Sequence, residues 1–337
     1  MAGTCSTRVT GSADHKSNCC DESTPTVKVV VTGGAGFIGA NLCRMLARQD
    51  DVDQVVALDD FSTGSAENLA GSPTVEIVEG SILSVQDLDR VMAGAQALVH
   101  LAARPSVPRS LADPMATHQV NATGTMMVLE AARRHGAPHV VVASSSSVYG
   151  ANPALPKRED MATMPVSPYA ASKLATEVYS LSYAHSFGLP VLVFRFFNVF
   201  GPLQSASHAY AAVVPTFISC ALARKPLPVH GDGTQTRDFT YVGTVASVLT
   251  DAVRRRVVDP GPVNLAYGSR VSLLELIAVL EDITGDALQV EHLEPRKGDV
   301  PHSQADRTRL SRMFPDVRPI PLSEGLRDTV GWFREAH

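Results

Sequence analysis

The chain has few cysteines and no pattern of metal ligands. It holds five cysteines in 337 residues, at Cys5, Cys19, Cys20, Cys43 and Cys220. A disulfide framework would use an even number at regular spacings, and no Cys or His spacing typical of a zinc site is present. We therefore expect reduced thiols, a cytoplasmic protein and no bound metal.

Long apolar runs and an excess of positive charge are also missing. No stretch of about 18 apolar residues occurs, so we expect no membrane span. The net charge of −5 provides no basic surface for nucleic acid. Residues 1–26 are small and polar and lack the apolar segment of a secretion signal, which predicts a disordered tail.

From residue 27 onward, strand-like and helical patterns alternate. Apolar, β-branched runs predict strands at 27–31, 54–58, 74–78, 96–101, 139–144, 190–195 and 261–266. Apolar residues at helical spacing predict helices near 37–49, 84–93, 115–135, 168–187, 209–224, 240–256 and 272–284. Repeated strand–helix units with apolar strands predict an α/β fold with a doubly wound, parallel sheet of the Rossmann type.

The alternation becomes irregular after residue 198, where glycines and prolines accumulate. We expect a smaller C-terminal α/β domain for the substrate, made of residues 199–239 and 267–337. The Rossmann-type domain would comprise residues 27–198 and 240–266. Ligands should bind in the crevice at the carboxyl ends of the strands.

A glycine-rich turn follows the first predicted strand, in the sequence VKVVVTGGAGFIG from Val27 to Gly39. Strand, glycine turn and helix together hold a pyrophosphate at the helix N-terminus. Gly33 would allow the tight turn, Gly36 the approach of the phosphates, and Gly39 the packing of helix on strand. Asp59 ends the second predicted strand, where a carboxylate binds a ribose diol and repels a 2′-phosphate. The segment therefore predicts NAD as the cofactor, in preference to NADP.

A tyrosine and a lysine four residues apart open a predicted helix. Tyr169 and Lys173 would lie on one helix face. An ammonium beside a phenol favours the phenolate and lowers the pKa of the phenol, so Tyr169 can accept a proton from a hydroxyl group near neutral pH. Ser145, in a serine run directly after a predicted strand, would relay that proton. The three residues are the predicted catalytic groups.

Nine short motifs occur in order along the chain. They are TGGAGFIG (32–39), LDDFSTG (58–64), HLAA (100–103), NATGT (121–125), SSSSVYG (144–150), YAASK (169–173), RFFNVFGP (195–202), GDGTQTRDFTYV (231–242) and RKGDVPHSQAD (296–306). As a set they resemble the extended short-chain dehydrogenase/reductase superfamily, in its nucleotide-sugar 4-epimerase and dehydratase branch. The resemblance implies bound NAD, a UDP-sugar substrate and a homodimer joined through helices 115–135 and 168–187. Residues on those helices that would lie in the interface or in the monomer core are Met126, Met127, Leu129, Tyr179 and Leu181.

The resemblance also implies residue roles by position. Cofactor contacts are implied for Gly33, Gly36, Phe37, Ile38, Gly39, Asp59, Phe61, Ser62, Gly64, Ser81, Ile82, Leu101, Ala102, Ala103, Arg104, Tyr169 and Lys173. Substrate contacts are implied for Asn121, Ser145, Ser146, Ser147, Tyr169, Asn198, Val214, Arg237, Arg296 and Ser303. Arg237 and Arg296 correspond to the pair that grips the nucleotide diphosphate. Ser81 departs from the family pattern, which has an aspartate there.

The preferred activity is NAD-dependent 4-epimerisation of a UDP-hexose through a transient 4-keto sugar. The sugar pair would be UDP-GlcNAc and UDP-GalNAc, or UDP-glucose and UDP-galactose. Ser303 stands where epimerases restricted to glucose and galactose have a bulky tyrosine, which leaves room for a 2-acetamido group. In this scheme Tyr169, assisted by Ser145, removes the 4-hydroxyl proton while the C4 hydride moves to NAD and back.

Three alternatives stay open. Nucleotide-sugar dehydratases typically carry Thr-Asp-Glu before VYG, whereas Ser145, Ser146 and Ser147 supply no carboxyl acid or base here. Uronate 4-epimerases and decarboxylases tend to have an arginine shortly after the GP of RFFNVFGP, and residues 203–207 contain none. This favours a neutral sugar unless another cation, such as Arg104 or Arg109, serves. A non-catalytic nucleotide-binding paralogue would usually lack the tyrosine or the lysine of YAASK.

Overall fold

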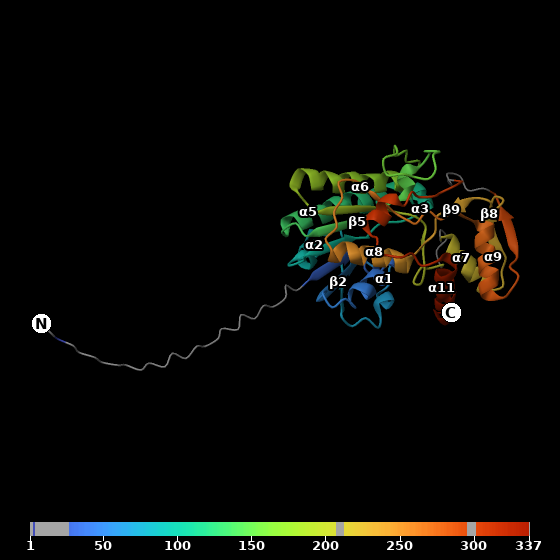
Figure 1. Ribbon diagram of the computed structural model, residues 1–337, viewed down its shortest axis with the longest axis horizontal. Helices are drawn as coiled ribbons and strands as arrows, with labels where there is room; N and C mark the ends of the chain where they lie inside the picture. The colour runs from blue at the N-terminus through green and yellow to red at the C-terminus, as the bar shows by residue number, and fades with distance from the viewer. Residues whose placement is uncertain (1–2, 4–26, 207–211, 295–300, 337) are drawn as a thin grey trace.

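A seven-stranded parallel sheet forms the larger part of the molecule (Figure 1). In the computed structural model, residues 3, 27–206, 212–294 and 301–336 are described, so most of the predicted tail lies outside them. The strands are β1 Lys28–Thr32, β2 Gln54–Asp59, β3 Val75–Glu79, β4 Ala97–His100, β5 His139–Ser145, β6 Val191–Phe196 and β11 Val263–Leu265. Their order is β11-β6-β5-β4-β1-β2-β3, and every neighbouring pair is parallel. The predicted α/β fold class is confirmed.

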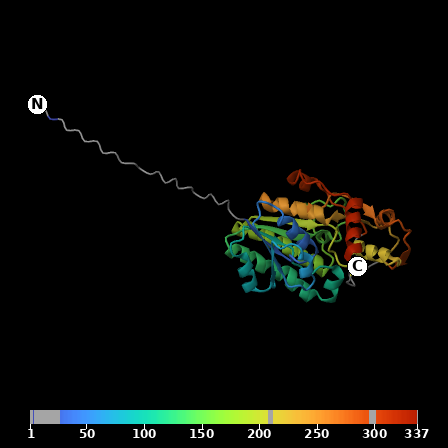
Figure 2. The same ribbon diagram turned by 90° about the horizontal axis from the view of Figure 1, so that it is seen from below.

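The central strands are buried on both faces, as their unbroken apolar sequences predict. In β1, Val29 and Val31 belong to one apolar cluster and Val30 to another, and all three are fully buried. The first cluster lies under α1 Phe37–Leu46 and α8 Val242–Arg254. The second lies under α2 Val85–Met92, α5 Gly124–Arg134 and α6 Pro168–Phe187, on the opposite side of the sheet (Figure 2). Helices on both faces define the doubly wound arrangement.

Helix α6 begins at a well-defined N-cap, which fixes the position of its first turn. The Ser167 side chain accepts a hydrogen bond from the backbone N–H of Ala170, and Pro168 occupies the first helical position. Both features favour a helix start. Gly188 ends the helix in the left-handed region with φ +66°. Tyr169 therefore lies in the first turn, beside the carboxyl ends of the strands.

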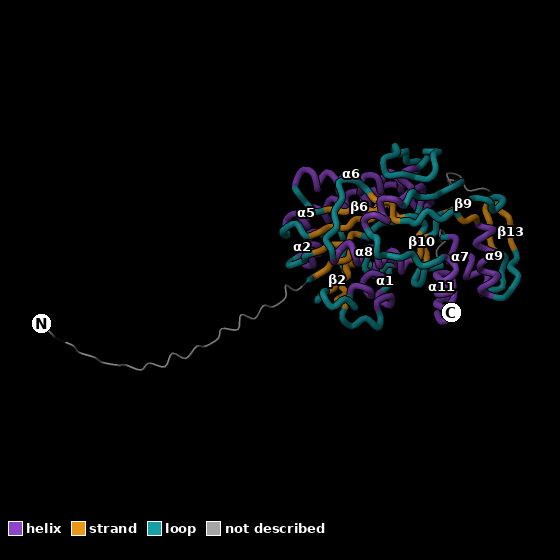
Figure 3. The backbone as a smooth tube through the Cα atoms, viewed as in Figure 1, coloured by secondary structure: helices purple, strands orange, loops and turns teal. Residues whose placement is uncertain are grey.

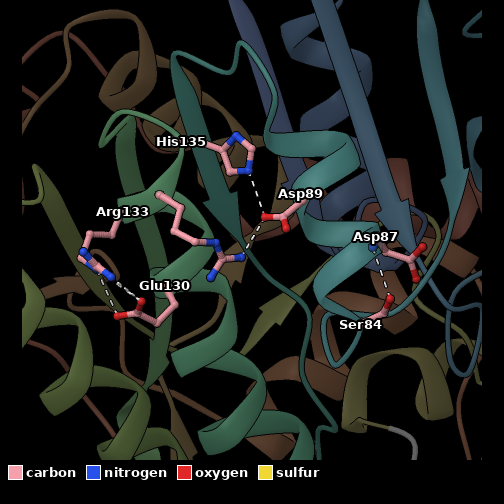
Figure 4. A network of polar contacts seen from close by, with 7 residues as sticks. Ser84, Asp87, Asp89, Glu130, Arg133 and His135 are labelled. Carbon is pink, nitrogen blue, oxygen red and sulfur yellow. Dashed lines mark hydrogen bonds and ion pairs between the residues drawn. The ribbon is translucent and has the colours of Figure 1, made fainter.

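The helical segment before β5 is broken at Asp113 and irregular after it. α3 Val107–Ala112 is followed by α4 Pro114–His118, a π-helical turn at Gln119–Thr123, and α5. At the far end of α5, Arg134 and His135 both contact the Asp89 carboxylate of α2, at 2.8 and 2.9 Å, and Arg133 pairs with Glu130 at 2.9 Å (Figure 4). Exposed pairs of this kind contribute little stability. The helices are held mainly by the apolar cluster beneath them.

The smaller part of the molecule lies beside the carboxyl ends of the large sheet (Figure 3). Its two-stranded sheets pair β7 Val199–Phe200 with β10 Thr240–Tyr241, β8 Leu227–His230 with β13 Val290–Leu293, and β9 Thr236–Arg237 with β12 Val271–Ser272. Its helices are α7 Val213–Leu222, α9 Leu273–Thr284 and α11 Leu322–Ala336. A separate apolar core, which includes Phe217, Leu276 and Phe333, joins them.

One segment departs from the predicted division of the chain. α10 Thr308–Met313 belongs to the residues assigned to the smaller domain, but Leu310 and Phe314 pack into the core of the large sheet with Val263 of β11. This segment packs with the large sheet because the apolar side of the short helix covers the last strand of that sheet. Its length gives too little periodicity to be recognised in the sequence.

Candidate active site

The carboxyl ends of five neighbouring strands open onto one cavity of about 570 Å³. Its wall includes Gly33 after β1, Asp59 of β2, Leu101 after β4, Ser145 of β5 and Phe196 of β6. The strand order reverses between β1 and β4, and a doubly wound sheet has its crevice at this point. The cavity therefore lies where the sequence predicts ligand binding.

The glycine turn forms the floor of this cavity. Gly33 has φ +70°, and a methyl group on it would stand 2.7 Å from the backbone nitrogen of Ala102. A side chain on Gly39 would collide with the carbonyl oxygen of Gly33. Gly36 lines the cavity and is the N-cap of α1, so its bare backbone and the positive end of the helix dipole face the open space. This cradle fits the pyrophosphate of a dinucleotide.

Asp59 stabilises the glycine turn through hydrogen bonds and also lines the cavity. Its carboxylate accepts hydrogen bonds from the backbone nitrogens of Ala35 and Phe61, both at 2.9 Å. The side chain is 7% exposed, and burial raises the pKa of this carboxyl in opposition to those hydrogen bonds. A carboxylate fixed by two amides still has lone pairs for a ribose diol.

Most of the predicted cofactor residues border the cavity. They are Gly33, Gly36, Phe37, Ile38, Gly39, Asp59, Ser62, Ile82, Leu101, Ala102, Ala103, Tyr169 and Lys173. Phe61 and Gly64 do not border it. Phe61 packs against the core below the sheet with φ +54°, and Gly64 lies against the backbone of Ala35 behind the glycine turn. Both residues support the glycine turn and do not themselves line the cavity.

Ser81 and Arg104 also lie outside the cavity wall. The Ser81 nitrogen donates to Asp87 at 3.0 Å and its hydroxyl accepts from the Leu83 nitrogen, so this residue shapes the loop after β3. The Arg104 guanidinium lies 3.6 Å from the carboxylate of Asp113. This pair is partly exposed, so the structure gives Arg104 a surface partner and no place in the cavity wall.

The three predicted catalytic residues do meet at the end of β5. Ser145, Tyr169 and Lys173 all border the cavity. Lys173 is 5% exposed, its ammonium donates to the carbonyl oxygen of Ala143 at 2.8 Å, and burial lowers its pKa to about 8. The Ser145 oxygen accepts from the Ser147 hydroxyl at 2.9 Å.

The pKa of Tyr169 differs from the sequence prediction. Burial raises it, and the hydrogen bond with Ser145 opposes that rise. The predicted lowering by Lys173 does not dominate, because the ammonium is directed at Ala143 and the phenol is desolvated. A further positive charge near Tyr169, such as an oxidised nicotinamide, would favour the phenolate.

Among the residues that the structure describes, serine hydroxyls and no carboxylates lie at the end of the cavity that holds Tyr169. Ser145, Ser146 and Ser147 border the cavity. The carboxylates among the described residues of the wall are Asp59 and Asp60, at the end of β2. The catalytic end of the cavity thus lacks a carboxyl acid–base pair for eliminating water.

The smaller part of the molecule supplies the opposite wall. Asn198, Arg237 and Ser303 border the main cavity, while Val214 borders a second cavity of about 230 Å³ that shares Asn198 and Arg237 with the first. The Arg237 guanidinium donates to the carbonyl oxygens of Thr236 and Pro301, at 3.0 and 3.1 Å. Arg296 lies outside the described residues.

Comparisons with known proteins agree with this geometry. The NAD dependent epimerase/dehydratase family matches residues 29–266. The chain belongs to this family. A UDP-glucose 4-epimerase of Mycolicibacterium smegmatis is 38% identical over 321 residues, which cover 91% of this chain and 99% of the relative. A dTDP-glucose 4,6-dehydratase of Streptomyces griseus is 35% identical over 317 residues, 92% and 95% of the two chains.

A solved structure of a related epimerase also supports membership of this family. A UDP-N-acetylglucosamine 4-epimerase from Methanobrevibacter ruminantium M1, in complex with UDP-N-acetylmuramic acid, has a TM-score of 0.87 and 35% identity, and covers 93% of this chain and 99% of its own. The protein is therefore an NAD-dependent enzyme of the nucleotide-sugar epimerase/dehydratase family. Because both reaction types occur among its relatives, the reaction has to be argued from the site.

Asn121 has a structural position in this member of the epimerase/dehydratase family. It is buried and absent from the wall of either substrate cavity. Its side chain accepts from the Arg104 nitrogen at 2.7 Å and donates to the Ser172 hydroxyl at 2.9 Å. It therefore joins the loop after β4 to α6 instead of facing the cavity.

Several residues of the cavity wall were missed by the sequence analysis. They include Pro105, Val107, Tyr149, Lys157, Val166, Gln204 and His302. Tyr149 lies within the motif SSSSVYG and His302 within RKGDVPHSQAD, so these motifs could have indicated both residues. Lys157 follows Pro156 in an irregular segment, where no periodicity indicates which side chains face inward.

Metal-binding clusters and membrane-spanning helices are both absent from the residues that the structure describes. No group of three or more His, Cys, Asp and Glu side chains is arranged to hold a metal ion in these parts of the chain. Within the same residues, no helix has both the length and the apolar character needed to cross a bilayer.

Proposed function

We propose that the protein interconverts two UDP-hexoses that differ in configuration at C4. The observation that carries this proposal is the grouping of Ser145, Tyr169 and Lys173 beside the glycine cradle, at an end of the cavity where the described residues include no carboxylate. Such a site can remove and return a hydroxyl proton. It has no acid–base pair for eliminating water.

Each catalytic side chain has a distinct role in this proposal. Tyr169 accepts the 4-hydroxyl proton, and Ser145 holds the reacting oxygen and relays the proton. Lys173 stabilises the phenolate while its ammonium is charged. NAD, when bound, supplies the acceptor and later the donor of the C4 hydride. Because the proton and the hydride both return, the reaction has no net redox change.

The nucleotide would lie against the smaller part of the molecule. Arg237 borders both cavities and suits a diphosphate, because a guanidinium forms paired hydrogen bonds to phosphate oxygens. The second cavity, with Val214 and Phe217 in its wall, would take the base. Arg296 remains the proposed second diphosphate contact.

The substituent at C2 would face Ser303. This small side chain borders the cavity, and its backbone nitrogen is held by the Thr236 carbonyl at 3.0 Å. A 2-acetamido group needs the volume that a tyrosine would fill. UDP-N-acetylglucosamine is therefore one substrate we propose, together with UDP-glucose.

We further propose a cytoplasmic homodimer joined through α4, α5 and α6. Exposed apolar side chains on these helices include Met115 at 74%, Val178 at 55% and Tyr179 at 38% exposure. Leu129 belongs to the monomer core instead, because it is fully buried under α5. Light scattering should give twice the monomer mass, and Val178→Glu should reduce it towards the monomer mass.

A proton NMR time course tests the proposed reaction. The protein is incubated with UDP-N-acetylglucosamine, UDP-glucose or UDP-glucuronate, without added reductant. A second anomeric signal should grow to a stable mixture of the two C4 epimers in at least one case. Vinyl or deoxymethyl signals instead would contradict the proposal, since they report elimination.

A further inference from the structure

Lys157 is a buried cation in the wall of the main cavity. The proposed mechanism assigns it no role. Its side chain is 4% exposed, yet the residue borders the cavity. The ammonium donates to the carbonyl oxygen of Asn152, which uses one of its three donors. Among the described residues, no carboxylate forms an ion pair with it.

The backbone of Lys157 is held firmly in place. Its nitrogen donates to the Gln304 carbonyl at 2.7 Å. Its carbonyl oxygen accepts from the Asp306 nitrogen and from the Asn264 amide, both at 2.8 Å. Asn264 in turn accepts a hydrogen bond from the Tyr149 hydroxyl at 2.7 Å. These bonds fix the backbone of Lys157, and the bond to the Asn152 carbonyl orients its ammonium, which reduces the entropy lost when a ligand binds.

Lys157 and Ser303 belong to the same wall. Lys157 forms a parallel bridge with Ala305, and bridged residues direct their side chains to the same face. Ser303 stands two residues before Ala305 in the same segment. Both residues border the cavity, together with Ser147 and Gly150. The lysine therefore belongs to the end of the cavity that would hold the hexose.

The charge of Lys157 has no counterion among the cavity-wall residues that the structure describes. The carboxylates among the described wall residues, Asp59 and Asp60, lie at the end of β2 in the cofactor part of the cavity. A buried ammonium without a counterion is costly, and burial lowers the pKa of this lysine. A negative charge on the substrate would offset that cost, whereas a neutral hydroxymethyl group would not.

We infer that Lys157 binds a carboxylate at C6 of the hexose, so that the enzyme prefers a UDP-hexuronate to the corresponding neutral UDP-hexose. The inference rests on the proposed 4-epimerase function and ranks a UDP-hexuronate above the neutral UDP-sugars named there. The missing arginine after Gly201-Pro202 favours a neutral sugar in the sequence. Lys157 supplies a cation from a different segment, at a position that the sequence alone does not associate with the site.

The test uses UDP-glucuronate and UDP-glucose, which differ only at C6, with UDP-N-acetylglucosamine as a third substrate. The wild-type kcat/KM should be higher for UDP-glucuronate than for UDP-glucose. In Lys157→Met this preference should fall about 10- to 100-fold, as expected for losing a charged hydrogen bond. Lys157→Arg should restore most of it. Lys28→Met is the matched control, because the Lys28 ammonium also donates to a backbone carbonyl, that of Ala93, but lies outside the cavity.

The outcomes distinguish a failure of the inference about Lys157 from a failure of the proposed 4-epimerase function. A parallel loss with both sugars in Lys157→Met would show a structural or diphosphate role and overturn the inference. A wild-type enzyme that epimerises only the neutral sugars would also overturn it, and needs no variant to fold. If none of the three sugars is epimerised, the proposed function fails. Decarboxylation of UDP-glucuronate that depends on Lys157 would support the lysine's role and contradict the epimerase.

Discussion

The ammonium of Lys173 donates a hydrogen bond to the carbonyl oxygen of Ala143, 2.8 Å away and 30 residues earlier in the chain. This bond fastens the first turns of α6 to the carboxyl end of β5. Tyr169, one helical turn before the lysine, is thereby held beside Ser145 at the mouth of the cavity. The YAASK motif therefore sets the position of Tyr169, the proposed proton acceptor, as much as its acidity.

The catalytic rate should fall as the pH rises through the pKa of Lys173. Burial lowers that pKa to about 8, so the ammonium that stabilises the Tyr169 phenolate is lost above this pH. We expect kcat to decline above about pH 8 and the decline to be absent from the much slower Lys173→Met variant. A wild-type kcat that stays constant far above this pH would contradict the assigned role.

Tyr169→Phe should lower kcat by about 10²- to 10⁴-fold while NAD stays bound.

Enlarging residue 303 should change the choice of sugar. Ser303→Tyr places an aromatic ring where the 2-acetamido group is proposed to lie. The ratio of kcat/KM for UDP-N-acetylglucosamine to that for UDP-glucose should fall by about tenfold or more. Ser303→Ala, which adds no volume, is the control and should keep the wild-type ratio. If the tyrosine variant also keeps it, the 2-substituent lies elsewhere.

Breaking the buried ion pair behind the serine loop should destabilise the fold. Arg195 contacts Glu177 at 2.6 Å, with side chains 4% and 5% exposed, and Ser144 donates to the same carboxylate. Arg195→Met leaves the Glu177 charge buried and should lower the free energy of unfolding by about 3–5 kcal/mol. Arg254→Met, at an exposed pair with Asp51, should lower it by less than about 1 kcal/mol. Chemical denaturation measures both, and equal losses would contradict this assignment.

The free energy of unfolding should depend on pH through the buried carboxyl group of Asp238. Burial raises the pKa of its carboxyl to about 6, although Gly268, Ser269 and Ala305 all donate to it. A folded pKa above the unfolded value means that the folded state holds a proton between about pH 4 and 6. The stability linked to this group is complete below that window and is lost as the pH rises through it, by about 3 kcal/mol.

Denaturation of wild type and Asp238→Asn across this pH range measures the effect. The stability of wild type relative to the variant should fall from about pH 4 to 6 and then stay level. Asp232 is a control of opposite sign, because hydrogen bonds from Thr234 lower the pKa of its carboxyl. Its contribution is lost as the pH falls. A wild-type advantage that grows with pH would show that Asp238 is ionised throughout.

The sequence predicts the parts of the site that depend on local chain geometry. Gly33 needs a left-handed turn after a buried strand, and Tyr169 and Lys173 need one helical turn between them. Both requirements are visible as short motifs. The seven strands of the large sheet follow in the same way from apolar runs with β-branched residues.

What the sequence does not predict depends on contacts between distant segments. Lys157 borders the cavity because its backbone pairs with residues 304–306, nearly 150 residues later. Asn121 faces α6 instead of the cavity because Ser172 and Arg104 use its hydrogen bonds. The raised pKa of Tyr169 comes from burial, which a spacing of four residues does not reveal. Such properties require the three-dimensional neighbours of each residue.

The most direct test of the proposed 4-epimerase follows a single hydrogen. A UDP-hexose that the enzyme converts is prepared with deuterium at C4 and incubated with the protein in ordinary water. Our account predicts that both epimers keep the deuterium at C4, because the hydride returns to the carbon it left while Tyr169 returns only the hydroxyl proton. Deuterium found at C6, or lost from the product, would contradict the account, since it would show that the 4-keto sugar undergoes elimination or another reaction before reduction.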